Sequence, residues 1–577
     1  MNYANNASLR LKLEAWRARL MIVVLLSLFA TLAVRALYLQ GLHNDFLRQK
    51  GEARYGRVIQ LSANRGMVAD RNGEPLAIST PVESIWASPD DVVTSAQQMR
   101  DLGQVLGMAP TEINARLKGA DRNFLYLKRQ ISPEIAARAM ALKIPGIFQQ
   151  REYRRYYPAG EVTAQVVGFT GVDDQGQEGL ELAYQTWLAG KPGSRRVIKD
   201  RLGHIIEDVE SIKVPQEGKT LTLSIDAKLQ YLAYRELKAA IDEHKAKGGE
   251  LVVLEAQTGE VLALVNLPDF NPNNRGKVTG AQTRNRVITD TYEPGSTLKP
   301  FTIAAALEAG KVQPDTAIDT AAGFLKIGPA TIRDAHREGP LTVAQVIQKS
   351  SNVGASKIAL SLPAETMWKL FRGVGFGQMP KTGFPGEAQG KLRPYRSWRP
   401  IEQATMSFGH GISVSLLQLT RAYGVFANDG QLPELTFVKS SAAASSQQVI
   451  SPETAHAVRN MLELVVQPGG TAPRAQVPGY RVAGKTGTAH KPDGHGYSAS
   501  RYISSFVGFA PASNPRLIIA VAIDEPSGSA YYGGTVAAPV FSDVMGSALR
   551  MLGVPMDSPS QSAAVPLTTI PEVKEEG

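Results

Sequence analysis

The chain has 577 residues and a formal net charge of +10, and this length predicts roughly two to four domains rather than one core. It contains no cysteine, which excludes disulfides and thiolate metal sites. Lys and Arg are dispersed and accompany no aromatic-rich nucleic-acid motif, so the positive charge does not predict nucleic-acid binding. It equally suits an anionic membrane surface or an acidic polymer.

Residues 20–39 form a long apolar segment near the N-terminus. Twenty helical residues span about 30 Å, the hydrocarbon thickness of a bilayer, and Arg35 lies near one end, where it can reach the interface. A cleaved signal peptide is the alternative, but Arg35 interrupts any small-residue cleavage site. We therefore expect an uncleaved single-pass membrane anchor. The basic residues before it predict a cytoplasmic N-terminus at residues 1–19 and place the chain after about residue 40 on the outer side of the membrane.

Residues 40–217 alternate short strand-like segments with turn signals such as Asn72-Gly73, which favours a hairpin. We expect an elongated α+β spacer, in which Arg151, Arg154 and Arg155 lie on solvated faces or in internal ion pairs.

Residues 218–556 predict a second α+β domain, a helical cluster flanked by an antiparallel sheet, which includes strand-like segments at 502–510 and 516–524. His490 and His495 are expected in one solvated loop, and no metal or cofactor is expected. Residues 557–577 are rich in Ser, Pro and Glu and predict a disordered tail.

Ser296 and Lys299 form an S-x-x-K pattern just before an apolar segment, residues 301–307, that is typical of a helix buried at the centre of a domain. Pro300 lacks an N–H and is tolerated only in the first turn, so the helix is expected to begin near Ser296. A spacing of three puts Ser296 and Lys299 on one helical face. A neutral Lys299, its pKa lowered by burial and by a second cation, Lys485, could then accept the serine proton.

Ser350 and Asn352 lie where one predicted helix gives way to the next. Ser and Asn are preferred N-caps, so an isolated S-x-N pattern would indicate capping. After an S-x-x-K pattern, Ser350 can instead relay a proton to a leaving amine, and Asn352 can hold a substrate amide.

A third pattern, Lys485-Thr486-Gly487-Thr488, follows a strand-like segment at Tyr480–Val482. Gly487 is expected to let a peptide substrate approach and pair with the strand edge. Lys485 and the Thr486 and Thr488 hydroxyls could receive a terminal carboxylate, while the Thr488 and Ser296 N–H groups form an oxyanion hole.

These three patterns resemble those of the penicillin-binding proteins, and three spacer segments resemble the class B branch. The spacer segments are Arg65–Gly73, Arg155–Pro158 and Gly176–Glu181. The chain is most similar to the septal cell-division peptidoglycan D,D-transpeptidases of Gram-negative bacteria. The resemblance implies a penicillin-binding domain with a five-stranded antiparallel sheet and cross-linking of stem peptides that end in D-Ala-D-Ala.

The resemblance also implies the site residues. The catalytic set is Ser296, Lys299, Ser350, Asn352 and Lys485, and substrate contacts are expected from Thr486, Gly487, Thr488, Glu293, His410, Tyr497, Arg501, Tyr502, Tyr531 and Tyr532. Septal members usually carry Tyr where this chain has His410. β-Lactam antibiotics, a polytopic lipid II polymerase and other division proteins are the implied partners.

The same patterns serve other proteins, so alternatives must be weighed. A β-lactamase needs a deacylating base, commonly on a Glu-x-x-Leu-Asn loop, and the chain has no such string. A penicillin sensor needs transmembrane or cytoplasmic signalling segments, and only about nineteen residues precede the single predicted span. A bifunctional class A enzyme needs a Glu-Asp-x-x-Phe pattern, which residues 41–217 lack. A D,D-carboxypeptidase, an elongation-type or accessory transpeptidase and a non-catalytic penicillin-binding scaffold or sensor remain open alternatives.

Overall fold

The computed structural model describes residues 14–39, 56–119, 124–199, 205–440, 445–494, 496–528 and 530–558. The chain divides into two compact units. The first contains Met1–Ala63, Val82–Glu152 and Lys191–Gln216, and the second contains Asn64–Pro81, Tyr153–Gly190 and Glu217–Gly577. The predicted tail at 557–577 and the predicted cytoplasmic segment at 1–19 lie largely outside the described residues.

Helix α1 (Ala15–Leu37) contains most of the predicted anchor. It has 23 residues, a mean hydropathy of 2.4 over its most apolar stretch, and no buried residue. It is the one helix of the described chain that is long and apolar enough to cross a membrane. The helix begins at Ala15, five residues before the predicted anchor at residues 20–39.

The first unit contains a three-stranded sheet and part of a five-stranded sheet. In one, β1 (Gly56–Leu61), β8 (Gly193–Lys199) and β9 (Ile205–Lys213) pair in that order. In the other, β3 (Pro75–Ala87) pairs with β4 (Leu125–Ile131) and β5 (Ile147–Tyr156). Three helices pack against these strands and form a buried apolar core with them: α3 (Ala96–Leu106), α4 (Pro110–Lys118) and α5 (Pro133–Ala141).

In the second unit, Asn72 and Gly73 turn between β2 (Val68–Ala69) and β3, as predicted, and Gly73 has a φ of +92°.

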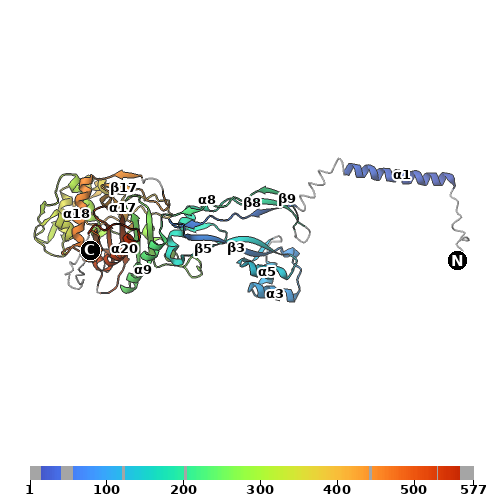
Figure 1. The fold of residues 1–577 in the computed structure, drawn as a ribbon, viewed down its shortest axis with the longest axis horizontal. Coiled ribbons are helices and arrows are strands. Elements are labelled where there is room, and N and C mark those ends of the chain that lie inside the picture. The colour runs from blue at the N-terminus through green and yellow to red at the C-terminus, as the bar shows by residue number, and fades with distance from the viewer. Residues whose placement is uncertain are drawn as a thin grey trace. The chain divides into compact units, whose positions relative to one another are not determined.

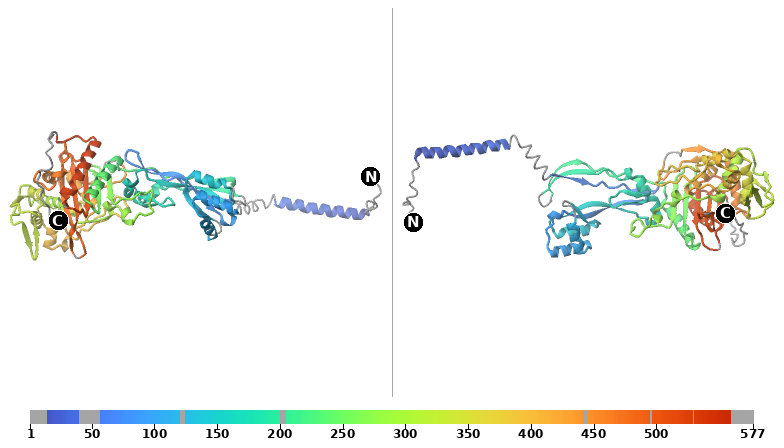
Figure 2. Two further views of the ribbon diagram at one scale, coloured as in Figure 1. Left: turned by 90° about the horizontal axis from the view of Figure 1, so that it is seen from below. Right: turned by 180° about the vertical axis from the view of Figure 1, so that it is seen from behind.

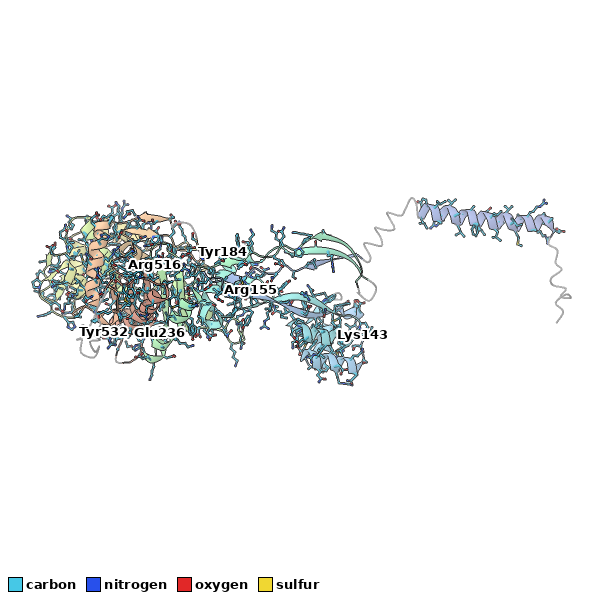
Figure 3. The ribbon with its side chains drawn as sticks, in the orientation of Figure 1. Lys143, Arg155, Tyr184, Glu236, Arg516 and Tyr532 are labelled. Atoms are coloured by element: carbon cyan, nitrogen blue, oxygen red, sulfur yellow. The ribbon has the colours of Figure 1, made fainter. Side chains whose placement is uncertain are left out.

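Arg155, labelled in Figure 3, lies in a buried ion-pair network with Arg65 and Glu181. Each guanidinium Nε lies 2.6 Å from a different Glu181 oxygen. The predicted internal ion pair is therefore correct for Arg155, and it links the three spacer segments that carry the family resemblance.

The second unit also contains the predicted five-stranded antiparallel sheet. Its order is β12 (Val261–Leu267), β11 (Gly248–Glu255), β21 (Leu517–Asp524), β20 (Tyr497–Ala510) and β19 (Ala483–Pro492). Helices α9 (Ala227–Glu243) and α20 (Ala538–Met551) pack together against the sheet (Figures 1 and 2). The larger helical cluster, including α17 (Leu416–Ala427) and α18 (Pro452–Val466), also contacts it.

Helix α12 (Lys299–Glu308) is the buried helix that the apolar segment predicts. Phe301 is fully buried, and its ring contacts Phe376, Tyr423 and Phe426 with centroid distances of 5.3, 5.4 and 4.9 Å. Aromatic contacts of this kind stabilise a core beyond their buried area. The first turn of α12 is thereby fixed inside the helical cluster.

Two local predictions are wrong. Tyr480–Val482 is not a strand: Val477 and Tyr480 close a turn through Gly479, whose φ is +85°, and the strand begins at Ala483. His490 does not lie in a loop but in β19, opposite Tyr502 of β20, and His495 lies outside the described residues. The strand expected around Lys485 extends through His490, because β20 supplies a partner for its backbone groups.

Candidate active site

Ser296 lies in a 3₁₀ turn, Gly295–Leu298, directly before α12, so the α-helix starts three residues later than predicted, at Lys299. Gly295 has a φ of +59°, a conformation that glycine adopts without strain. Lys299 is 0% exposed and Ser296 is 6% exposed. Lys299 Nζ lies 2.9 Å from Ser296 Oγ, so the predicted pair is in hydrogen-bonding contact.

Ser350 lies in the turn between α13 (Val343–Gln348) and α14 (Asn352–Leu360). Its φ is +60°, which is uncommon for a residue with a side chain and marks a strained position. The turn directs two oxygens at Lys299, because Lys299 Nζ donates to the Ser350 carbonyl and lies 3.0 Å from its Oγ. Lys485 Nζ lies 2.9 Å from the same Oγ. One hydroxyl therefore bridges both lysines.

Ser351, rather than Ser350 or Asn352, is the N-cap of α14. Its Oγ accepts from the Gly354 N–H at 2.8 Å and donates to Asp334 at 2.7 Å. Asp334 also accepts from the Val353 N–H at 2.9 Å, and this carboxylate at the helix N-terminus fixes the turn. Sequence reasoning missed both residues. The cap role of Ser351 leaves Ser350 free to face the lysines.

Lys485 is fully buried in β19, the edge strand of the sheet. The Thr486 hydroxyl lies 2.9 Å from that of Thr471, and Thr488 Oγ1 accepts from the Gly533 N–H at 3.2 Å. Gly487 also lies against the nucleophile turn. A Cβ there would lie 2.9 Å from the Pro294 carbonyl oxygen and 3.0 Å from Thr297, so glycine lets the nucleophile turn itself approach the strand.

Glu293, His410 and Tyr497 come together beside the nucleophile turn. The Tyr497 hydroxyl lies 3.0 and 2.8 Å from the two Glu293 oxygens, and Glu293 also accepts from the Gly411 N–H at 2.8 Å. The His410 ring lies 5.6 Å from that of Tyr497. Burial, followed by the hydrogen bond to Glu293, raises the pKa of Tyr497 above its ordinary value.

The pKa of His410 is lowered. Burial is the largest cause; Glu293 opposes it, and nearby His490 and Lys299 lower the value further. His410 is therefore mainly neutral at neutral pH, and its ring forms part of an aromatic wall with Phe408 at 5.2 Å.

Tyr502, Tyr531 and Tyr532 form a second aromatic group beyond Thr488. Tyr502 stacks on Tyr531 at 4.3 Å and contacts His490 at 4.5 Å, while Tyr532, labelled in Figure 3, lies 4.4 Å from Tyr531. Arg501 donates to Ser498 at 3.3 Å, and no contact described for it reaches the three motifs. The structure thus brings the tyrosines together and leaves Arg501 apart.

Two contacts that support the nucleophile turn were also not predicted from the sequence. A Cβ on Gly409 would lie 2.2 Å from the Gly295 carbonyl oxygen, so only glycine fits there. The Tyr423 hydroxyl donates to the Thr297 carbonyl at 2.8 Å. Among the described residues, no cluster of three His, Asp or Glu side chains could hold a metal ion.

Comparison with known proteins assigns the family. Residues 249–546 match the penicillin binding protein transpeptidase domain, and residues 60–223 match the penicillin-binding protein dimerisation domain. The chain is 44% identical over 553 residues to the probable peptidoglycan D,D-transpeptidase PenA of Neisseria gonorrhoeae, covering 95% of each chain. It is 40% identical over 550 residues to the peptidoglycan D,D-transpeptidase FtsI of Escherichia coli K12, covering 94% of this chain and 93% of that one.

A solved structure supports the same assignment. The apo transpeptidase domain of Burkholderia pseudomallei penicillin-binding protein 3 has a TM-score of 0.55 and 50% identity, and it covers 58% of this chain and 98% of that one. The fold and the three motifs define a penicillin-binding serine acyltransferase. The chain belongs to the class B penicillin-binding proteins, in the FtsI family of peptidoglycan D,D-transpeptidases.

Proposed function

We propose that the chain cross-links peptidoglycan stem peptides through an acyl-enzyme on Ser296. The hydrogen-bonded set Ser296, Lys299, Ser350 and Lys485 is the observation that carries this proposal. Burial and the proximity of a second ammonium both disfavour the charged form of an amine, which favours a neutral Lys299 as base.

Acylation begins when Ser296 Oγ attacks the carbonyl between the last two D-Ala residues and its proton passes to Lys299 Nζ over 2.9 Å. The new O–C bond leaves an oxyanion, which the Ser296 and Thr488 N–H groups stabilise. The C–N bond then breaks. The proton moves from Lys299 through the Ser350 hydroxyl to the leaving D-Ala amine.

Deacylation uses an acceptor amine from a second stem peptide. Its nitrogen attacks the acyl ester and a C–N bond forms. The bond between Ser296 Oγ and the acyl carbon breaks, and a proton from the amine passes through Lys299 to Ser296 Oγ. The donor peptide lies along the free edge of β19, where Lys485 and Thr488 receive its terminal carboxylate before cleavage. β-Lactams enter by the same first step, and their ring nitrogen is the leaving group.

Mass spectrometry of the penicillin-treated full-length protein tests the assignment. We expect one penicilloyl adduct, on the tryptic peptide that contains Ser296, and its loss in Ser296→Ala. Ser361→Ala, which changes a serine at the end of α14, is the matched control and should keep the adduct. An adduct on another peptide, or undiminished labelling of Ser296→Ala, would sink the assignment.

The cellular role that we propose is septal, with α1 as an inner-membrane anchor, the second unit in the periplasm, and a polytopic lipid II polymerase with other division proteins as partners. The similarity to the protein named FtsI supports this role. Depletion of the protein distinguishes it from an elongation role: filamentous cells support septal synthesis, and round cells contradict it.

A further inference from the structure

A short hairpin beside the second motif has one apolar face and one exposed face. Strands β14 (Phe324–Ile327) and β15 (Ala330–Arg333) pair with Phe324 opposite Arg333 and Lys326 opposite Thr331. These four side chains are exposed, whereas the alternate residues are partly or fully buried. The period-two alternation makes Phe324, Lys326, Thr331 and Arg333 the outer face of the hairpin.

The inner face of the hairpin packs against the segment that contains Ala404 and Phe408. Ile332, Ala404 and Phe408 form a small buried cluster, with Leu325 and Ile327 packed on it. Phe408 directly precedes Gly409, which lies against Gly295 of the nucleophile turn. The hairpin is therefore seated on the segment that supports Ser296.

The last residue of β15 is tied to the second motif. Asn352 Nδ2 donates to the Arg333 carbonyl at 3.3 Å, and the next residue, Asp334, accepts from Ser351 and Val353. The backbone of Arg333 is thus fixed directly beside the residue that is proposed to hold the substrate amide.

The outer face is positively charged and its charges are available. The Arg333 guanidinium and the Lys326 ammonium make no hydrogen bond or ion pair with any described residue. Asp334, the acid that directly follows Arg333, is bound to the start of α14, where it accepts from Ser351 and Val353. An anion that approaches this face therefore meets two unneutralised cations.

We propose that the outer face of the β14–β15 hairpin is a subsite for a carboxylate of the donor peptide upstream of the scissile bond, with the Arg333 guanidinium as its main ligand. The inference rests on the proposed function, since Asn352 holds the donor amide only if the chain acts on peptides. Guanidinium matches a carboxylate with two parallel hydrogen bonds, and Phe324 and Thr331 supply an apolar and a hydroxyl contact beside it.

Two penicillins with the same short peptide side chain test the subsite. One carries a free carboxylate in that side chain and the other carries a carboxamide, while the ring carboxylate is common to both. In the full-length protein at low salt, we expect the carboxylate probe to acylate Ser296 about tenfold faster than the carboxamide probe. Salt should reduce this preference, because the subsite is exposed.

Substitutions show which residue causes the preference for the carboxylate probe. Arg333→Ala should bring the ratio of the two rates to about one, and Arg333→Glu should invert it. Arg550→Ala removes an exposed cation of α20 and should keep the wild-type ratio. An unchanged ratio in Arg333→Ala, or an equal loss with both probes, would overturn the subsite. A wild-type protein that neither probe acylates at Ser296 would overturn the proposed function itself.

Discussion

Lys299 and Lys485 share one hydrogen-bond acceptor, because their Nζ atoms lie 3.0 and 2.9 Å from the Ser350 hydroxyl. The two amines come from a helix and from an edge strand that are separated by almost two hundred residues of sequence. Two buried ammonium groups around one oxygen would repel each other, so the arrangement favours a state in which one amine is neutral.

The first prediction concerns the identity of the base. Lys299→Arg keeps the positive charge but cannot release its proton at working pH, so acylation should be lost. Loss of a general base typically lowers a rate by about 10² to 10⁴, and stopped-flow acylation with a fluorescent penicillin measures it. Lys357→Arg, the same change on α14, should stay within about twofold of wild type if only chemistry at Lys299 matters. A rate for Lys299→Arg within tenfold of wild type would refute the role.

The second prediction separates two adjacent serines. Ser350→Ala removes the bridging hydroxyl and should lower acylation by about 10² or more, with little change in the thermal midpoint. Ser351→Ala removes the N-cap of α14 and should lower the free energy of unfolding by about 1 kcal/mol. Acylation kinetics and thermal unfolding of both variants give the comparison. Equal acylation losses in the two variants would contradict the division of roles.

Local chemistry made part of the fold predictable. Pro300 placed the start of the buried helix to within three residues, and the Asn72-Gly73 turn needed only its two residues. Backbone restrictions of proline and glycine act over a few residues and do not depend on the rest of the fold.

Other parts of the site depend on contacts between residues far apart in the sequence, which no local pattern predicts. The Tyr497 and Glu293 side chains meet across 204 residues, and Gly487 is small because Pro294 and Thr297 lie against it. The left-handed backbone of Ser350 is held by the capping of its neighbour Ser351 and by Asp334. A propensity argument gives no reason for a serine to adopt that conformation.

The third prediction concerns His410. Because burial lowers its pKa, imidazole should gain a proton only below the ordinary histidine range, so wild type and His410→Tyr should show parallel acylation profiles from about pH 6.5 to 8. Below about pH 6 the wild-type rate should depart from that of His410→Tyr, since a new cation appears near Lys299.

Second-order acylation measured from mildly acidic to neutral pH checks this prediction. His456→Tyr, a change at an exposed histidine of α18, is the control for histidine loss in general. Profiles that stay parallel down to pH 5 would mean that His410 acts only as part of the aromatic wall. Divergence at pH 7.5 would mean that its pKa is not lowered.

The last prediction concerns a buried acid behind the site. Glu250 lies on β11, and its Oε2 and the Tyr292 hydroxyl are buried without a hydrogen-bond partner among the described residues. Burial, followed by Asp290, raises the pKa of Glu250 to about 8, with Asp524 also raising it and Arg286 and Arg284 opposing. The folded protein therefore binds a proton that the unfolded chain releases at its ordinary pKa of 4.5.

The sign of the pH dependence follows. The stabilisation that comes from the proton on Glu250 is complete below about pH 4.5. It is lost as pH rises toward about 8, and above that pH the stability no longer changes through this group. Glu250→Gln keeps a neutral side chain at every pH, so its thermal midpoint should fall less than that of wild type between pH 5 and 8, and it should be the more stable protein at pH 8.5. Glu243→Gln, an exposed change on α9, should follow the wild-type curve. A difference between wild type and Glu250→Gln that is the same at every pH would show that Glu250 does not hold this proton.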